Sequence, residues 1–159
     1  MKNEDKKSSN FENKDITLLQ LKRVTNVTKG GRRFHFTCLM LVKDSINDTI
    51  GFSLASGNEV STAIKKAVKK AKKNMVKYFS SPVRTVPHDI FVKFKSTKIM
   101  IKPAPAGNGI KAGASLGKIF KYLGIKDVTA KIIGSNNKLN VTKAGFLALS
   151  KLSWKKNVL

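Results

Sequence analysis

The sequence predicts an α+β protein of two small domains, with the element order β-β-β-α in the first and β-β-α-β-α in the second. Segments in which apolar and polar side chains alternate are followed by segments with an apolar stripe every 3.6 residues, and this succession occurs twice. Prolines and serines interrupt both patterns near the middle of the chain. We therefore expect a disordered leader at 1–15, a domain at 16–79, a linker at 80–88, a domain at 89–152 and a short tail at 153–159.

The first domain is expected to open with a hairpin. Residues 16–42 predict a strand, a turn and a second strand, in which the two-residue period places Phe36, Cys38 and Met40 on one face. The paired glycines Gly30 and Gly31 fit the turn, because glycine adopts positive φ without strain. A polar turn at 44–48 then leads to a third strand at about 49–54.

A helix is expected next, with Asn58 or Ser61 as its N-cap. Its apolar stripe comprises Val60, Ile64, Ala67, Val68, Ala71 and Met75. Its other face carries Lys65, Lys66, Lys69, Lys70, Lys72, Lys73 and Lys77. A solvated helix usually alternates Glu with Lys to form pairs four residues apart, and here only Glu59 is acidic. The lysines fit either a plain solvent-exposed face or a surface for a polyanion.

The second domain is predicted to contain strands at about 89–94 and 98–102, followed by a glycine-rich loop, Gly107-Asn108-Gly109. A helix after the loop ends at Gly124, and a third strand covers about 127–133. Asn140 is the expected N-cap of the last helix. A loop between strand and helix can cradle phosphate, but these glycines also fit a plain turn.

The charge of the chain indicates a polyanionic partner. Lys and Arg number 32 against 9 Asp and Glu, a formal charge of +23 on 159 residues. The excess is +10 in residues 1–79 and +13 in 80–159, so both halves contribute to it. Repulsion of this size disfavours an isolated compact domain. Hydrophobic residues make up 41% of the chain, which allows a core. No apolar run approaches the roughly 20 residues of a membrane span, and we expect no membrane contact.

Catalytic and cofactor sites are not supported. The single cysteine, Cys38, is expected in the core, and His35 points to the opposite strand face. The spacing of Lys118 after the glycine loop does not match a nucleotide P-loop. We expect no carboxylate beside that loop that is placed to hold Mg²⁺; Asp89 and Asp127 lie far apart in the sequence. We expect no enzyme activity, no cofactor and no metal.

Several motifs, in order, resemble the small-subunit ribosomal protein S-five family of bacterial type. In the first domain they are Val27-Thr28-Lys29-Gly30-Gly31-Arg32-Arg33-Phe34, Gly51-Phe52, Glu59-Val60, Ala63-Ile64 and Lys66-Ala67. In the second they are Pro87-His88, Lys102-Pro103-Ala104-Pro105, Gly107-Asn108-Gly109, Ala112-Gly113, Gly124-Ile125-Lys126-Asp127, Gly134-Ser135-Asn136 and Asn140-Val141. The matches span about residues 20–150. Ser53, Ala55 and Ser56 stand where the family usually has glycines and a lysine.

The resemblance implies a first domain like double-stranded-RNA-binding domains and a second with the S-five domain-two fold. It implies a structural, rRNA-binding constituent of the small ribosomal subunit that supports assembly and translational accuracy near the mRNA entry path and the decoding region. The implied partners are small-subunit rRNA and small-subunit proteins four and eight, with mRNA nearby and no homo-oligomer. The implied location is the cytoplasmic ribosome of a bacterium, or an organellar ribosome.

We expect rRNA contacts from the hairpin turn, the lysine face of the first helix, the glycine loop and the turn before the last helix. These residues are Lys29, Gly30, Gly31, Arg32, Arg33, Lys65, Lys66, Lys69, Lys70, Lys73, Gly107, Asn108, Gly109, Lys111, Ser135 and Asn136. Two other functions stay open. The second domain's fold is similar to that of small-molecule kinases of the galactokinase–mevalonate kinase type. A free regulator that binds double-stranded RNA is the other alternative.

Overall fold

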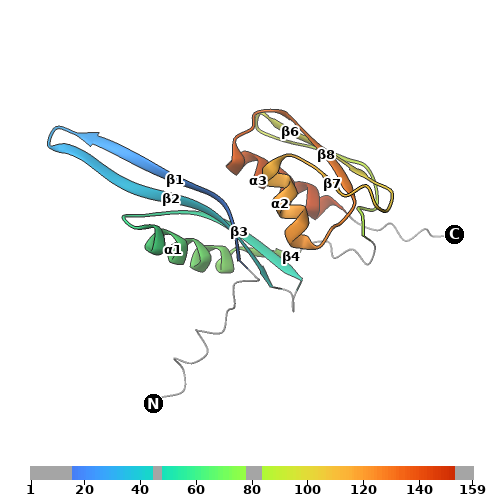
Figure 1. Ribbon diagram of the computed structural model, residues 1–159, viewed down its shortest axis with the longest axis horizontal. Helices are drawn as coiled ribbons and strands as arrows, with labels where there is room; N and C mark the ends of the chain where they lie inside the picture. Colours follow the sequence, from blue (N-terminus) through green and yellow to red (C-terminus); the bar gives the residue numbers. More distant parts are fainter. Residues whose placement is uncertain (1–15, 45–47, 78–83, 153–159) are drawn as a thin grey trace, which may run out of the picture. The chain divides into compact units, whose positions relative to one another are not determined.

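The computed structural model describes residues 16–44, 48–77 and 84–152. The leader expected at 1–15, the tail at 153–159 and residues 80–83 of the expected linker lie outside this part. Contacts divide the chain between Val76 and Lys77 into two compact units. Each unit combines strands and helices, which confirms the predicted α+β class (Figure 1).

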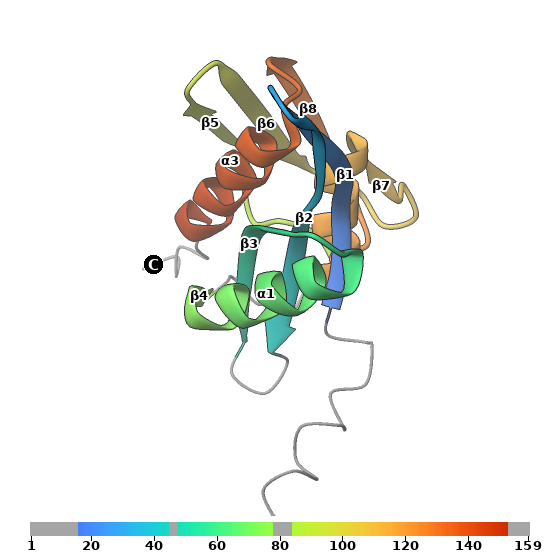
Figure 2. The same ribbon diagram turned by 90° about the vertical axis from the view of Figure 1, so that its left-hand side faces the viewer.

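The first unit is a sheet covered by one helix. Its strands are β1 (Ile16–Thr28), β2 (Gly31–Asp44), β3 (Thr49–Gly57) and β4 (Met75–Lys77), in the sheet order β1-β2-β3-β4. The β1–β2 and β2–β3 pairs are antiparallel. Helix α1 (Val60–Lys73) packs against β2 and β3 on one face of this sheet (Figure 2).

The core of the first unit lies between β2 and α1. The buried residues Cys38 and Met40 of β2 form one cluster with Ala63 and Ala67 of α1. This confirms the predicted strand face and most of the predicted helix stripe. The small alanines let the helix backbone approach the sheet closely, which leaves little room for larger side chains at the contact.

Close approach explains two glycines of β3. A Cβ added to Gly51 would lie 2.4 Å from the carbonyl oxygen of Ala71. One added to Gly57 would lie 2.8 Å from the backbone nitrogen of Ala63. Between them, the hydroxyl of Ser53 donates a hydrogen bond of 2.6 Å to the carbonyl oxygen of Ala67. Helix α1 therefore packs on β3 with its backbone atoms in direct contact with the strand.

The ends of α1 differ from the prediction. Glu59 is the N-cap, rather than Asn58 or Ser61, and its side chain makes no cap bond. The helix ends at Lys73, so Met75 and Lys77 belong to β4. Met75 accepts a hydrogen bond of 3.5 Å from the Thr49 hydroxyl on its sulfur, and its side chain lies against Gly51. Lys77 is therefore not part of the lysine face of α1.

The second unit is a four-stranded sheet with two helices. Its elements are β5 (Ile90–Phe94), β6 (Thr97–Pro103), β7 (Ile110–Lys111), α2 (Ala114–Leu123), β8 (Val128–Gly134) and α3 (Lys138–Lys151). The sheet order is β5-β6-β8-β7, with β7 parallel to β8 and the other pairs antiparallel. Helix α3 packs against β5 and β6, and α2 packs against α3 and β7.

Most predicted elements of the second unit are confirmed. Gly124 ends α2 in the left-handed region with φ of +86°, as expected of a helix C-cap. The N-cap of α3 is Asn137 rather than Asn140: its side chain accepts a hydrogen bond of 3.1 Å from the backbone N–H of Leu139. Asn140 therefore lies inside the helix. Strand β7 was not predicted. In the described part of the chain, no helix is long and apolar enough to cross a membrane.

Candidate nucleic-acid interface

The hairpin of β1 and β2 extends beyond the rest of its sheet. The β2–β3 register ends at Phe36↔Gly57, whereas the β1–β2 register continues to Thr28↔Gly31. We call the extension, residues 24–35, the hairpin arm; it projects past β3 and α1 in Figure 1. At its tip Gly31 has φ of +131°, and the Thr28 hydroxyl donates a hydrogen bond of 3.1 Å to the Gly31 carbonyl. Gly31 thus has the positive φ predicted for the paired glycines, whereas Gly30 does not.

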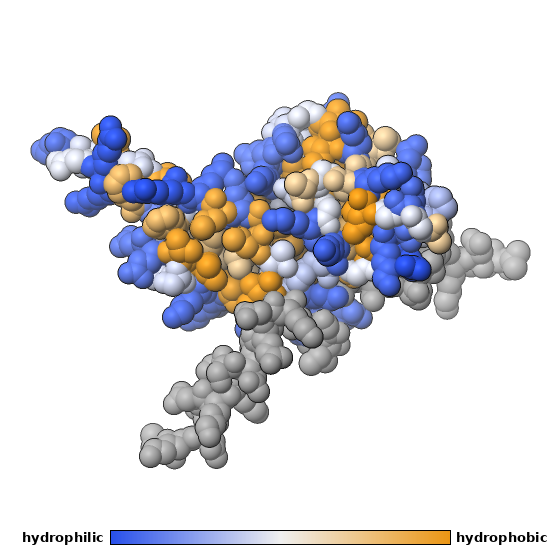
Figure 3. All heavy atoms as spheres, in the orientation of Figure 1, coloured by the Kyte–Doolittle hydropathy of each residue, from blue (hydrophilic) through white to orange (hydrophobic). Residues whose placement is uncertain are grey.

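The arm presents cations to solvent. Lys29, Arg32 and Arg33 are exposed, and none of them forms an ion pair with a described residue. The end of the arm is mostly hydrophilic in Figure 3. Nearer its base, the guanidinium of Arg23 lies 3.9 Å from the ring centroid of Phe34, a cation–π contact that braces the two strands. The arm is therefore a supported projection with free positive charge.

Helix α1 adds a second basic surface in the same unit. The alanines of α1 pack on the sheet and leave the opposite face of the helix in solvent. Five lysines on that face are exposed: Lys65, Lys66, Lys69, Lys70 and Lys73. None of these five lysines pairs with a carboxylate of the described chain. We call this set the lysine face.

The arm and the lysine face meet at a hollow of about 420 Å³. Arg33 from the arm and Lys66 from α1 both line it. Its wall also includes Asn26, His35, Ser56 and Asn58. Asn26, His35 and Asn58 are not among the predicted rRNA contacts, because no motif or run of cations marks them in the sequence. The structure thus connects two of the predicted basic segments and adds polar side chains between them.

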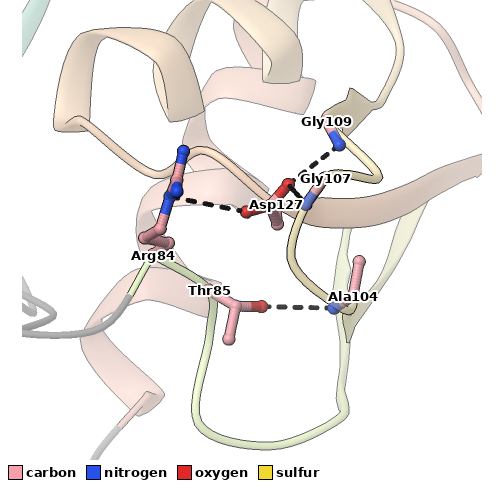
Figure 4. A network of polar contacts seen from close by, with 6 residues as sticks. All are labelled: Arg84, Thr85, Ala104, Gly107, Gly109 and Asp127. Atoms are coloured by element: carbon pink, nitrogen blue, oxygen red, sulfur yellow. Dashed lines mark hydrogen bonds and ion pairs between the residues drawn. The ribbon is translucent and has the colours of Figure 1, made fainter.

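The glycine loop of the second unit is organised around a buried acid (Figure 4). Oδ1 of Asp127 accepts hydrogen bonds from the backbone N–H groups of Gly107, at 3.1 Å, and Gly109, at 2.9 Å. The N–H of Asn108 donates to the carbonyl oxygen of Pro105 at 3.2 Å. All three backbone donors are therefore used within the protein, which removes them as a phosphate cradle.

The sequence did not place a carboxylate beside this loop, and the structure brings Asp127 there from 18 residues later in the chain. The side chain of Asp127 is buried there, and its Oδ2 forms no hydrogen bond with a described residue. The Arg84 guanidinium approaches that oxygen to 3.8 Å, and the Arg84 carbonyl accepts hydrogen bonds from Lys126 and Asp127. Gly107 and Gly109 have φ of +91° and +71°, and a Cβ added to either would have no atom within 4 Å. Their backbone conformation, rather than close packing, requires glycine.

The remaining candidate residues lie in two places on the second unit. Lys111 is exposed in β7, directly after the glycine loop. Ser135 stabilises the turn before α3: its N–H donates to Ser96, and its carbonyl accepts from the Thr97 hydroxyl at 2.9 Å. Asn136 is exposed beside it. The structure does not bring Ser135 and Asn136 into one described cluster with the glycine loop.

No catalytic constellation emerges from the part of the chain that the structure describes. It contains no group of three His, Cys, Asp or Glu residues that could hold a metal ion. Cys38 is fully buried, and burial raises the pKa of its thiol above the ordinary value of 9.0. A protonated thiol is a poor nucleophile, so Cys38 is a core residue.

Comparison with known proteins assigns the chain to a family. Residues 15–78 match the family model "Ribosomal protein S5, N-terminal domain", and residues 92–158 match "Ribosomal protein S5, C-terminal domain". The chain is 40% identical over 142 residues to the small ribosomal subunit protein uS5 of Chlamydia pneumoniae, which covers 89% of this chain and 86% of that protein. The chain belongs to the ribosomal protein S5 family.

Two further uS5 proteins give similar values. The chain is 40% identical over 138 residues to that of Chloroflexus aurantiacus, which covers 86% of this chain and 75% of the relative. It is 42% identical over 131 residues to that of Borreliella afzelii, which covers 82% and 78%. The resemblance found in the motifs is thus confirmed, and the chain is a structural, non-enzymatic protein of the small ribosomal subunit. This assignment excludes the alternative of a small-molecule kinase.

Proposed function

We propose that this ribosomal protein S5 family member binds small-subunit rRNA through the hairpin arm and the lysine face of α1. The observation that carries the proposal is the set of exposed cations in one unit, on two elements that meet at Arg33 and Lys66, with no described carboxylate paired to them. Each phosphate neutralised by such a cation releases a condensed counterion, which favours binding and makes it depend on salt.

The two basic surfaces suit different tasks. The arm is long and narrow, and its tip lies outside the core, so it can enter a groove or junction of folded RNA without disturbing the sheet. The lysine face is a convex row of point charges that follows the sugar–phosphate backbone. Contacts of both kinds respond to the shape of RNA rather than to its base sequence. We propose that they support assembly of the subunit and translational accuracy near the mRNA entry path and the decoding region.

The glycine loop contributes differently. Because its backbone amides are bonded to Asp127 and Pro105, we propose that it presents Asn108 and the neighbouring Lys111 to rRNA as a rigid turn. Ser135 and Asn136 are proposed to contact rRNA from the turn before α3, where the internal bonds of Ser135 fix the backbone. Fixed turns lower the entropy lost on binding.

Protein partners are proposed from exposed apolar side chains. Leu21 of the edge strand β1 is 41% exposed, and Phe91 of the edge strand β5 is 59% exposed. Apolar groups on sheet edges favour contact with other proteins. We propose small-subunit proteins four and eight as these partners, as the resemblance implies, in the cytoplasmic ribosome of a bacterium.

Sedimentation of a cell lysate in a sucrose gradient tests the proposal. We expect the protein to co-migrate with the small subunit at one copy per particle, and to stay there through a moderate-salt wash. Protein found mainly at the top of the gradient would contradict the ribosomal proposal and would favour a free RNA-binding regulator. Isolated rRNA fragments that bind with no dependence on salt would contradict phosphate neutralisation by the two basic surfaces.

A further inference from the structure

The hollow lined by Arg33 and Lys66 lies where strand β3 leaves β2. Register with β3 ends at Phe36↔Gly57, so β2 has no strand partner on that side before Phe36 within the described chain. The chain turns away through Ser56 and Asn58 into α1. The space left beside β2, about 420 Å³, is within the range of about 300–1,000 Å³ typical of pockets for small organic molecules.

The lining of the hollow differs from the basic surface around it. The lysine face offers ammonium groups, which only donate hydrogen bonds. In the hollow, Asn26 and Asn58 each present an amide that both donates and accepts, and the Ser56 hydroxyl does the same. The described residues that line it include no Asp or Glu. Groups of mixed donor and acceptor character can distinguish base edges, which a row of ammonium groups cannot do.

The hollow also has aromatic side chains in its lining. His35 and Phe34 both line the hollow, and Phe34 is 45% exposed although Arg23 covers part of its ring. Proteins recognise unpaired RNA bases by stacking them on such rings and bonding their edges. Paired A-form RNA offers phosphates and 2′-hydroxyls on a regular surface, and needs no hollow of this kind.

We propose that this hollow holds one unpaired nucleotide of the RNA strand that the arm and the lysine face bind. Arg33 and Lys66 bind its phosphate, Asn26 and Asn58 bind the edge of its base, and His35 or Phe34 packs on the base. The inference rests on the proposed rRNA binding and adds the chemical class of one contact. A free mononucleotide has the same chemistry, but the flanking cations Lys65, Lys69 and Lys70 favour a strand whose neighbouring phosphates they neutralise.

The test uses the full-length chain and two RNA duplexes that differ in one nucleotide: one carries a single bulged 2-aminopurine, and the other lacks it and is fully paired. We expect the bulged RNA to bind about tenfold more tightly, as one stacked and hydrogen-bonded base supports. Its fluorescence should fall on binding. Ser56→Leu places a branched apolar side chain in the hollow from an exposed position and adds no aromatic ring, so it should abolish the preference and keep the affinity for the paired duplex.

A second variant, Asn26→Ala with Asn58→Ala, removes the two amides without adding volume and should reduce the preference as well. It also covers the case in which Ser56→Leu does not fold, which thermal unfolding of each variant will reveal. Lys69→Ala with Lys70→Ala is the matched control, because these lysines do not line the hollow. It should weaken binding of both duplexes by the same factor.

The outcomes separate this inference from the proposed function. Equal, salt-dependent binding of both duplexes would overturn the nucleotide site and leave rRNA binding intact. A preference that survives in both hollow variants would also overturn it. Binding of neither RNA would contradict both proposals. Saturable displacement of the bulged RNA by free adenosine monophosphate would overturn the assignment to a strand, since a free nucleotide would then suffice.

Discussion

Oδ1 of Asp127 accepts a hydrogen bond of 2.9 Å from the backbone N–H of Gly109, and it also accepts one from the N–H of Gly107 (Figure 4). One buried carboxylate therefore fixes a loop that lies 18 residues earlier in the chain. Arg84 approaches the other oxygen from a third segment. The glycine loop, whose sequence allowed a phosphate-binding loop, thus uses its backbone N–H groups to bind a carboxylate of its own chain.

Replacement of Asp127 by alanine should release this loop. We expect Asp127→Ala to lower the free energy of unfolding of the second unit by about 1–3 kcal/mol, because the N–H groups of Gly107 and Gly109 lose their hydrogen-bond acceptor. Water can replace that acceptor at Gly107, which is exposed, and this limits the loss. The amides of Gly107 and Gly109 should exchange with solvent faster. Denaturant unfolding and hydrogen exchange measure the two effects.

Asp89 provides the matched control for Asp127. Its ion pair with Lys102 is 3.7 Å long, and both side chains are more than half exposed. Exposed pairs of this kind contribute about 0–1 kcal/mol, so Asp89→Ala should leave unfolding almost unchanged. Equal effects of the two substitutions would show that the Asp127 bonds do not stabilise the loop.

The contact between β3 and α1 gives a second prediction. Gly51→Ala should destabilise the first unit by about 2 kcal/mol or more, because its Cβ would meet the carbonyl oxygen of Ala71 at 2.4 Å. Gly30→Ala is the control, with nothing within 4 Å and no positive φ, and should stay within about 0.5 kcal/mol. Urea denaturation compares them. A stable Gly51→Ala protein would mean that α1 can move away from the sheet at little cost.

Much of the fold could be predicted because local patterns specify it. Alternation places Cys38 and Met40 toward the helix, and the alanine stripe places α1 on the sheet. The end of α1 could not be located, because Met75 continues the helical period although it packs from a strand against Gly51. Two asparagines three residues apart both fit the N-cap of α3, and β7 has only two residues, too few for a period.

The candidate site could be predicted only where charge marks it. The cations of the arm and of α1 stand out in the sequence, and all of them prove exposed. The contact of Asp127 with Gly107 and Gly109 depends on chain packing, since nothing local links residues 18 and 20 apart. The hollow depends on the early end of β3 and gathers residues from β1, β2, β3 and α1. Such relations need tertiary structure.

Burial of Cys38 leads to a prediction about pH. The pKa of this thiol is higher in the folded state than its ordinary value of 9.0, so above about pH 9 the unfolded chain loses the proton while the folded protein keeps it. Its contribution to stability is complete below that pH and falls as pH rises. The free energy of unfolding should therefore fall more between about pH 7 and pH 10 in the wild type than in Cys38→Ala. Parallel curves in urea denaturation would contradict the pKa shift.

The arm carries the last prediction. Arg32→Ala with Arg33→Ala should leave the fold intact, because both side chains are exposed beyond the end of β3. The variant should bind rRNA more weakly, with a salt slope smaller by about one to two units as up to two phosphate contacts are lost. In cells it should impair subunit assembly or decoding accuracy, measured by gradient profiles and a misreading reporter.

The control variant, Arg32→Lys with Arg33→Lys, keeps both charges and should keep the salt slope, although Lys lacks the planar two-bond contact of Arg. Unchanged assembly, accuracy and slope in the alanine variant would show that the arm does not bind RNA.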